Sequence, residues 1–343
     1  MLPSLPVELV REIVACILVS PPDNVFYEPS RHPKPDWSLI SSFSVASKAY
    51  RALALEAWFR ALFMKSPAHF SFIQHNLPEI RNSWTRKLYC LTTYHRYIVD
   101  ESQWKASSWD LTGFRRLLAI RLDCRSLVVT SPSGAYRFPF RNIPNSVTEL
   151  ELRGLRWPSP FVFETLADTF PELRILRLSQ HRVWCGLCHA CTTVRFAEPA
   201  PSNIVYNEGL GLPIHYARML STLQQLHTVS IAMSYSEGTS IHLNPDDPSK
   251  DLWSGECDAC VGLMYVDVAF REDYMARKRG THLAEPSKEF KQLYIKPPAL
   301  KIVIWTFHRL DVDDGWDDEE TDEESDDEGA TLSARLCTQG HPG

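Results

Sequence analysis

The spacing of hydrophobic residues changes along the chain, from a helical period in the first part to a strand period in the rest. Within residues 1–63, apolar side chains recur every three or four positions, which is typical of helices with one buried face. Consecutive prolines end the first of these helices, and a polar, proline-bearing insert at about 20–36 precedes the next. The stretch from Leu77 to about Trp104 also has helical spacing. The sequence therefore predicts a helical domain at 1–63 and linker helices within 64–112.

Beyond Gly113, a short strand template recurs five times. Each copy alternates apolar and other residues, and alternation at period two indicates a strand with one buried side. The copies are Leu118-x-Ile120-x-Leu122, Val147-x-x-Leu150-x-Leu152, Leu173-x-x-Leu176-x-Leu178, Leu226-x-x-Val229-x-Ile231 and Leu300-x-x-Val303-x-Trp305. The first two intervals are 30 and 26 residues, and the next two stretch to 53 and 74. We therefore expect an α/β body at 113–310 with long insertions at about 183–215 and 245–290.

Five of the nine cysteines lie within these insertions, in two Cys-x-x-Cys blocks. The first block contains Cys185 and Cys188, with Cys191 three residues further on, and the second contains Cys257 and Cys260. Each Cys-x-x-Cys turn can direct two thiolates at one ion, and four thiolates without an oxygen ligand favour zinc. Such a site leaves no position for water, so we expect a structural zinc that joins the two insertions. The connection between the pairs is far longer than the roughly 15–20 residues of a compact zinc ribbon.

Other interpretations of the cysteines stay open. They can be buried free thiols, which pack as small hydrophobic groups, or they can form disulfides, although no secretion signal marks the chain. The spacing of Cys185, Cys188 and Cys191 also begins a bacterial ferredoxin motif, but the fourth Cys-Pro is missing. His189 could replace one cysteine as a ligand. A redox-active role is disfavoured because no thioredoxin-like strand–helix context surrounds Cys185.

Charge is distributed unevenly between the body and the C-terminus. The formal net charge is −6, and residues 311–328 hold thirteen carboxylates and no Lys or Arg, so the rest of the chain carries +7. A like-charged run of this density repels itself and has little to bury, which predicts a disordered acidic tail at 311–343. The tail would be simply solvated, or would act as an interaction segment or as a shield over the basic body.

Several classes of protein are disfavoured by the sequence. No apolar run approaches the ~18 residues that a membrane span needs, and the N-terminus lacks the basic and then apolar pattern of a signal peptide. We therefore expect a cytoplasmic or nuclear protein with reduced thiols and no membrane partner. The sequence has no nucleophile elbow, zinc-protease helix, phosphate-binding loop or dinucleotide fingerprint. This indicates a protein that is not an enzyme.

The N-terminal helices carry a recognisable pattern. Leu5-Pro6-Val7-Glu8-Leu9 is followed by Ile13, then by Val45-Ala46-Ser47-Lys48-Ala49-Tyr50, Leu53 and Trp58. This pattern resembles an F-box, although the insert at 20–36 replaces the short turn of most F-boxes. The cysteine-bearing blocks are similar to those of F-box-like proteins in mushroom-forming fungi. The strand template of the body resembles a leucine-rich repeat, whose usual period is about 20–29 residues.

The resemblance implies a substrate-receptor subunit of a cullin–RING (SCF-type) ubiquitin ligase. Its F-box would bury apolar side chains against the adaptor subunit, and its repeat body would bind a protein substrate. The adaptor-binding residues would be Leu5, Pro6, Leu9, Ile13, Val45, Tyr50 and Leu53. The same residues could instead form the core of an ordinary helical pair packed on the body. The alternative function is a zinc-stabilised nucleic-acid-binding protein or a stand-alone protein-interaction module.

Overall fold

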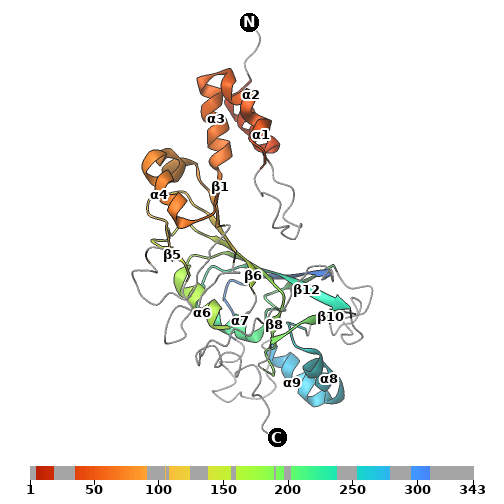
Figure 1. Ribbon diagram of the computed structural model, residues 1–343. Helices are drawn as coiled ribbons and strands as arrows, with labels where there is room; N and C mark the ends of the chain where they lie inside the picture. Colours follow the sequence, from red (N-terminus) through yellow and green to blue (C-terminus); the bar gives the residue numbers. More distant parts are fainter. Residues whose placement is uncertain are drawn as a thin grey trace, which may run out of the picture.

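The computed structural model describes most of the helical domain and of the body. The described residues are 5–18, 35–90, 105, 108–123, 138–155, 160–188, 191–196, 202–237, 253–278 and 295–309. Most of the insert at 20–36 and the whole predicted tail at 311–343 lie outside this part of the chain. Figure 1 shows the N-terminal helices at one end of the molecule and the last two helices at the other.

Three helices form the N-terminal domain: α1 (Val7–Ile17), α2 (Ser38–Ala46) and α3 (Lys48–Phe59). They share a small core of Val14, Ile40 and Ala54, against which Trp37 and Trp58 pack. The hydroxyl of Ser47 caps α3 by accepting a hydrogen bond from the Tyr50 N–H at 3.1 Å. The expected continuation of this helix to Phe63 is wrong, because α3 ends at Phe59 and the next residues form a strand.

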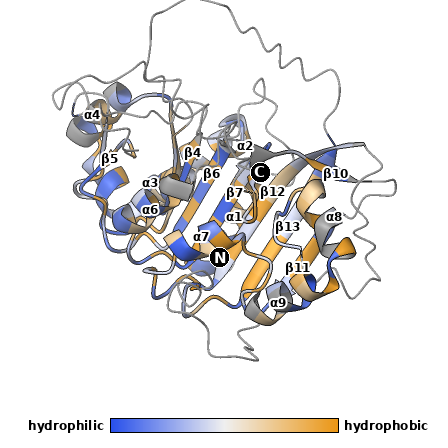
Figure 2. Ribbon diagram, turned by 90° about the horizontal axis from the view of Figure 1, so that it is seen from below, coloured by the Kyte–Doolittle hydropathy of each residue, from blue (hydrophilic) through white to orange (hydrophobic). Residues whose placement is uncertain are grey.

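A nine-stranded sheet forms the body. In spatial order its strands are β1 (Ala61–Met64), β2 (Lys87–Cys90), β4 (Ala119–Asp123), β6 (Glu149–Leu155), β7 (Ile175–Gln180), β12 (Thr228–Glu237), β13 (Ile302–Arg309) and β11 (Asn203–Asn207), with β10 (Val194–Phe196) also pairing β12. Every pairing in this sheet is parallel except that of β11 with β13. From β1 to β13 the spatial order follows the chain order, and Figure 2 shows the central strands running side by side. The antiparallel β11 closes one end.

The predicted strand template fixes the register of the sheet. Equivalent template positions lie directly beside one another and are at most 1% exposed: Leu88, Ile120, Leu150, Leu176, Val229 and Val303. The leading leucine or valine is also buried in the other four copies. In the first copy the predicted leading residue was Leu118, but Leu117 is buried in its place. Leu118 precedes its strand and is 46% exposed, because strand alternation does not extend into the turn. The α/β class predicted from the sequence is thus confirmed, as a mostly parallel sheet with helices.

Helices cover the face of the sheet that carries these buried side chains. α6 (Pro160–Thr169) and α7 (Ile214–Met219) pack against each other there, with the rings of Phe163 and Tyr216 4.1 Å apart. Towards β1, the cover consists of α4 (Pro67–Asn76) and a short π-helix, η1 (Ile80–Trp84). A two-stranded sheet pairs β3 (Trp109–Asp110) with β5 (Phe140–Arg141).

The expectation of helices throughout 64–112 is met only in part. α4 and η1 are helical, but Lys87–Cys90 forms β2, a central member of the sheet. Leu88 and Cys90 point into the core from this strand. The error has a physical cause, since Trp84, Leu88 and Leu91 also fit a helical period and a four-residue strand has too few residues to show its own alternation. Residues 91–104 lie outside the described part.

Candidate metal centre

The first Cys-x-x-Cys pair lies in the turn of a short hairpin. β8 (Val183–Trp184) pairs antiparallel with β9 (Cys191–Thr192), and Cys185 follows β8 directly. A Cβ on Gly186 would lie 3.3 Å from the Cβ of Ile214, so the turn is packed closely on the start of α7. The hairpin is therefore held by the body before any ion is considered.

The second pair lies at the start of a helix. Cys257 precedes α8 (Asp258–Val266), and its carbonyl oxygen accepts a hydrogen bond from the Val261 N–H at 2.9 Å. Cys260 is in the first turn of this helix. The loop before α8 approaches the hairpin closely at Gly255. This glycine has φ +93°, and a Cβ added to it would lie 2.7 Å from the side chain of Val183. Glycine is needed at this position both for its backbone angle and for the contact.

The two pairs meet, although they are far apart in the sequence. The Sγ atoms of Cys185, Cys188, Cys257 and Cys260 all lie within 4.8 Å of one another. The sulfurs of Cys188 and Cys257 are 3.6 Å apart. Zinc–sulfur bonds of about 2.3 Å in a tetrahedron place sulfurs about 3.8 Å apart. The four side chains therefore suit a tetrahedral ion with only small movements, and they could bind a metal.

Sequence reasoning named five cysteines, and the structure brings four of them together. The backbone of Cys191 opens β9 beside Trp184, but its side chain lies outside the described part, as does His189. Cys185 and Cys260 are buried, Cys257 is partly buried and Cys188 is exposed. A bound ion would thus be shielded on most sides and would face solvent beside Cys188.

The cysteines also perturb one another electrostatically. Hydrogen bonds from Cys185 and Cys260 lower the pKa of Cys257 to about 4, and its backbone N–H in turn donates to the sulfur of Cys185 at 3.4 Å. Interactions with Cys185 and Cys257 raise the pKa of Cys260. Cys257 lies at the N-terminus of α8, which favours negative charge there, and a divalent cation among the four sulfurs would stabilise their thiolate forms.

A buried carboxylate that sequence reasoning missed organises the second loop. Glu256 is 2% exposed and accepts hydrogen bonds from Ser254, at 2.5 Å from the backbone N–H and 2.7 Å from the hydroxyl. It also accepts one from the hydroxyl of Tyr274, on α9 (Val268–Lys278). The indole N–H of Trp253 donates to the Glu256 carbonyl at 2.9 Å. Glu256 thus ties α9 to the loop that leads into Cys257, a link for which the sequence carried no signal.

The residues predicted to bind an adaptor subunit lie mostly on the surface. Leu5 is 58% exposed, Leu9 47%, Ile13 49%, Val45 79% and Tyr50 37%, and Pro6 is also exposed. Leu53 differs, because it is only 9% exposed and packs inward. On the same helices Val7, Ile17 and Leu39 are exposed as well. The N-terminal helices therefore present an apolar surface and bury little of the predicted set.

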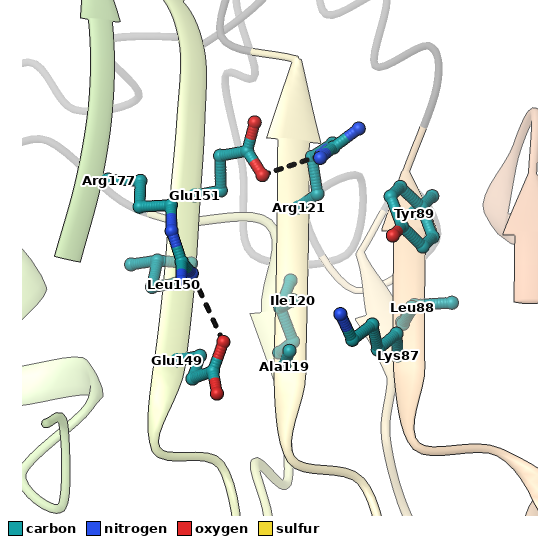
Figure 3. Close-up of a pocket in the computed structure, with 10 residues that line it drawn as sticks. All are labelled: Lys87, Leu88, Tyr89, Ala119, Ile120, Arg121, Glu149, Leu150, Glu151 and Arg177. Carbon is teal, nitrogen blue, oxygen red and sulfur yellow. Dashed lines mark hydrogen bonds and ion pairs between the residues drawn. The ribbon is translucent and has the colours of Figure 1, made fainter. Parts of the chain in front are cut away.

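The face of the sheet opposite the helices carries ion pairs and the Tyr89 ring (Figure 3). The Arg121 guanidinium lies 4.6 Å from the centre of the Tyr89 ring and donates to Glu151 at 2.7 Å. One strand further, Arg177 pairs with Glu149 at 3.1 Å. These residues line a shallow pocket over β2, β4, β6 and β7.

Comparison with protein-family models and with curated proteins found no match for this sequence. Within the described residues, none of the helices has both the length and the apolar character required to span a bilayer. The function is therefore argued from the residues themselves.

Proposed function

We propose that this protein is a substrate-receptor subunit of a cullin–RING ubiquitin ligase. Its N-terminal helices bind the adaptor subunit as an F-box does, and its leucine-rich-repeat-like body binds a protein substrate. The protein performs no chemistry itself, and it promotes transfer by holding the substrate near the ubiquitin-carrying subunits. The observation that carries this proposal is the apolar surface on α1 and α2.

The exposure of these residues favours a partner over the alternative of an internal core. The three helices already have a core in Val14, Ile40 and Ala54, so the exposed residues are not needed to fold them. A contiguous exposed apolar patch typically marks an interaction site. Burying the half that remains exposed of a leucine or isoleucine contributes about 1 kcal/mol. Leu5, Leu9 and Ile13 together would then supply about 3 kcal/mol to adaptor binding.

The body supports the second half of the proposal. Parallel strands that add in chain order, with helices on one face, suit a short solenoid in which each unit packs on its neighbours. On the opposite face, the pocket lined by Arg121, Glu151 and Arg177 is the surface to which we assign the substrate. The four clustered cysteines suit zinc because all the donors are sulfur. We infer a structural zinc that fastens the hairpin of Cys185 to α8.

Co-purification with the adaptor subunit tests the proposal. The intact chain should retain the adaptor, whereas Leu5→Ala/Leu9→Ala/Ile13→Ala should lose it while keeping its far-UV circular dichroism spectrum. The matched control is Val205→Ala/Val266→Ala/Val268→Ala, which truncates three apolar residues that are 54%, 84% and 49% exposed elsewhere. This control should bind the adaptor like the intact chain. A folded intact chain that recovers no adaptor would contradict the proposal.

A further inference from the structure

Positively charged residues gather where strands β1, β2 and β4 begin. We call this group the basic edge, and it consists of Arg60, Arg81, Arg86, Lys87, Arg115 and Arg116. The backbone places its members on adjacent strands, because the N–H of Arg86 donates to the carbonyl of Arg60 at 2.9 Å and the N–H of Leu118 donates to that of Arg86 at 2.8 Å. The side chain of Arg81 lies over the turn at Gly113. The basic edge is therefore one surface assembled from three strand beginnings.

The charge of the basic edge is poorly compensated. Burial lowers the pKa of Arg86, and repulsion from Arg116 and Arg60 lowers it further, against the weaker attraction of Glu56. Glu56 also pairs with Arg11, at 3.4 Å. The guanidinium of Arg86 is held by backbone carbonyls, the nearest that of Ser83 at 2.8 Å, which carry no net charge. Arg60, Arg115, Arg116 and Lys87 are exposed. A surface of this kind favours an anionic partner.

The same chain contains a segment of opposite charge. Residues 311–328 hold thirteen carboxylates and no basic residue, and they lie outside the described part of the chain. They follow β13, which belongs to the same sheet and ends at Arg309. No other stretch of the sequence matches this density of charge. Residues 311–328, which complement the charge of the basic edge, therefore belong to the same chain as the basic edge.

The lengths of chain and sheet permit the contact. β13 is separated from β4 by four strand spacings and from β1 by six, which corresponds to about 19–29 Å across the sheet. The acidic segment follows the end of β13, whereas the basic edge lies where the strands start. The length of β13 therefore adds about 23 Å in the perpendicular direction. The diagonal is thus about 30–37 Å, which an extended chain covers in about 9–12 residues. Carboxylates from about residue 320 to Glu328 can reach the basic edge.

We propose that the acidic segment 311–328 docks on the basic edge of its own chain through its carboxylates from about residue 320 onward, as an intramolecular cover that an external anionic partner must displace. The attraction is electrostatic and weakly directional, so it holds the segment near the surface without a fixed register. This inference does not depend on adaptor binding. It explains why a chain with a basic body carries a strongly acidic run directly after its last strand.

Zero-length crosslinking of the full chain tests this proposal. A carbodiimide joins a lysine amine to a carboxylate in contact with it, and Lys87 is the lysine of the basic edge. Lys301 precedes β13 at the same side of the sheet and is the internal reference for an undirected segment. At about 0.05 M NaCl, crosslinks from 311–328 to Lys87 should exceed those to Lys301 severalfold, and at about 0.5 M they should fall to the same level.

A matched pair of variants separates the basic edge from charge in general. Arg60→Ala/Arg115→Ala/Arg116→Ala should abolish the preference for Lys87. Arg51→Ala/Arg195→Ala/Arg218→Ala removes the same charge from exposed positions elsewhere and should preserve it. The salt dependence of the unaltered chain stands independently if a variant folds poorly.

Three outcomes would overturn the proposal. Equal crosslinking of Lys87 and Lys301 at low salt would mean that the segment is not directed to the basic edge. Crosslinks between isotopically labelled and unlabelled chains would assign the basic edge to a second copy of the protein. If Lys87 is protected from crosslinking and nuclease treatment removes that protection, the basic edge would be assigned to nucleic acid.

Discussion

Replacing Cys257 by serine should remove the metal and loosen one end of the body. The sulfur of Cys257 is central to the cluster, since it is 3.6 Å from that of Cys188 and hydrogen bonds with Cys185 and Cys260. Its loss leaves three of the four clustered cysteine ligands, one fewer than the four ligands of a closed structural zinc site. Cys191→Ser is the matched control, because four other cysteines already form the cluster.

The expected magnitude follows from mass action. An ion present at about a thousand times its dissociation constant stabilises the folded state by about 4 kcal/mol. For a chain of this size, each kcal/mol shifts Tm by about 2–4 °C, so the metal-free protein should melt about 8–16 °C lower. The loss should be concentrated in α8 and α9, which the Cys257 loop and Tyr274 attach to the body.

Metal content and thermal melting measure this effect together. The unaltered chain and Cys191→Ser should each hold one metal ion, and X-ray absorption should show four sulfur neighbours at about 2.3 Å for zinc. Cys257→Ser should hold none, and a chelator should lower the Tm of the unaltered chain to its level. A chain whose Tm is insensitive to both chelator and substitution, or an ion bound through oxygen, would refute the reasoning.

Three further predictions test other parts of the structure. Gly211→Ala should lower the free energy of unfolding by about 2–4 kcal/mol, because φ is +78° and the new Cβ would lie 2.2 Å from the Tyr206 ring. The control is Gly262→Ala, whose new Cβ meets nothing within 4 Å, and it should be neutral or stabilising. Urea titrations measure both. Glu256→Gln should cost about 1–3 kcal/mol and raise hydrogen exchange in α9, whereas unchanged exchange would exclude its bridging role. Burial raises the pKa of Asp110, but surrounding hydrogen bonds outweigh it and leave the pKa low. The ionised carboxylate therefore stabilises the protein fully above about pH 4, and this stabilisation is lost as pH falls through the pKa of the folded state. Asp110→Asn should make the free energy of unfolding less dependent on pH in acid.

Sequence patterns predicted the interior of the sheet better than its beginning. In the five template strands, beginning with that of Ile120, two buried positions are separated by one that is not buried, and a leading leucine or valine marks the turn before the strand. β1 lacks this contrast, since all four of its residues are apolar. Such a run of apolar residues can form either a helix or a strand. β1 is a strand because it pairs with β2, and the residues next to β1 in the sequence do not encode that partner.

The candidate metal centre was predictable for a different reason. Cysteine pairs at Cys-x-x-Cys spacing are rare enough to predict, without knowledge of the fold, that their side chains cluster, as Cys185, Cys188, Cys257 and Cys260 do. Glu256 was not predictable, because a buried glutamate is recognisable only once Ser254 and Tyr274 are known to surround it. The basic edge is similar, since Arg60, Arg86 and Arg116 become neighbours only through strand pairing.

The separation of the two cysteine pairs along the chain has a consequence during synthesis. Cys188 and Cys257 are 69 residues apart, and ribosomes add about 5–20 residues per second, so the first pair is made roughly 3–14 seconds before the second. During that interval the two thiols of Cys185 and Cys188, three positions apart, exist without their partners, and they are open to premature oxidation or to capture of a wrong ion. For the zinc site that we propose, a reducing environment and buffered zinc would therefore be requirements of biogenesis, beyond any role in the finished molecule.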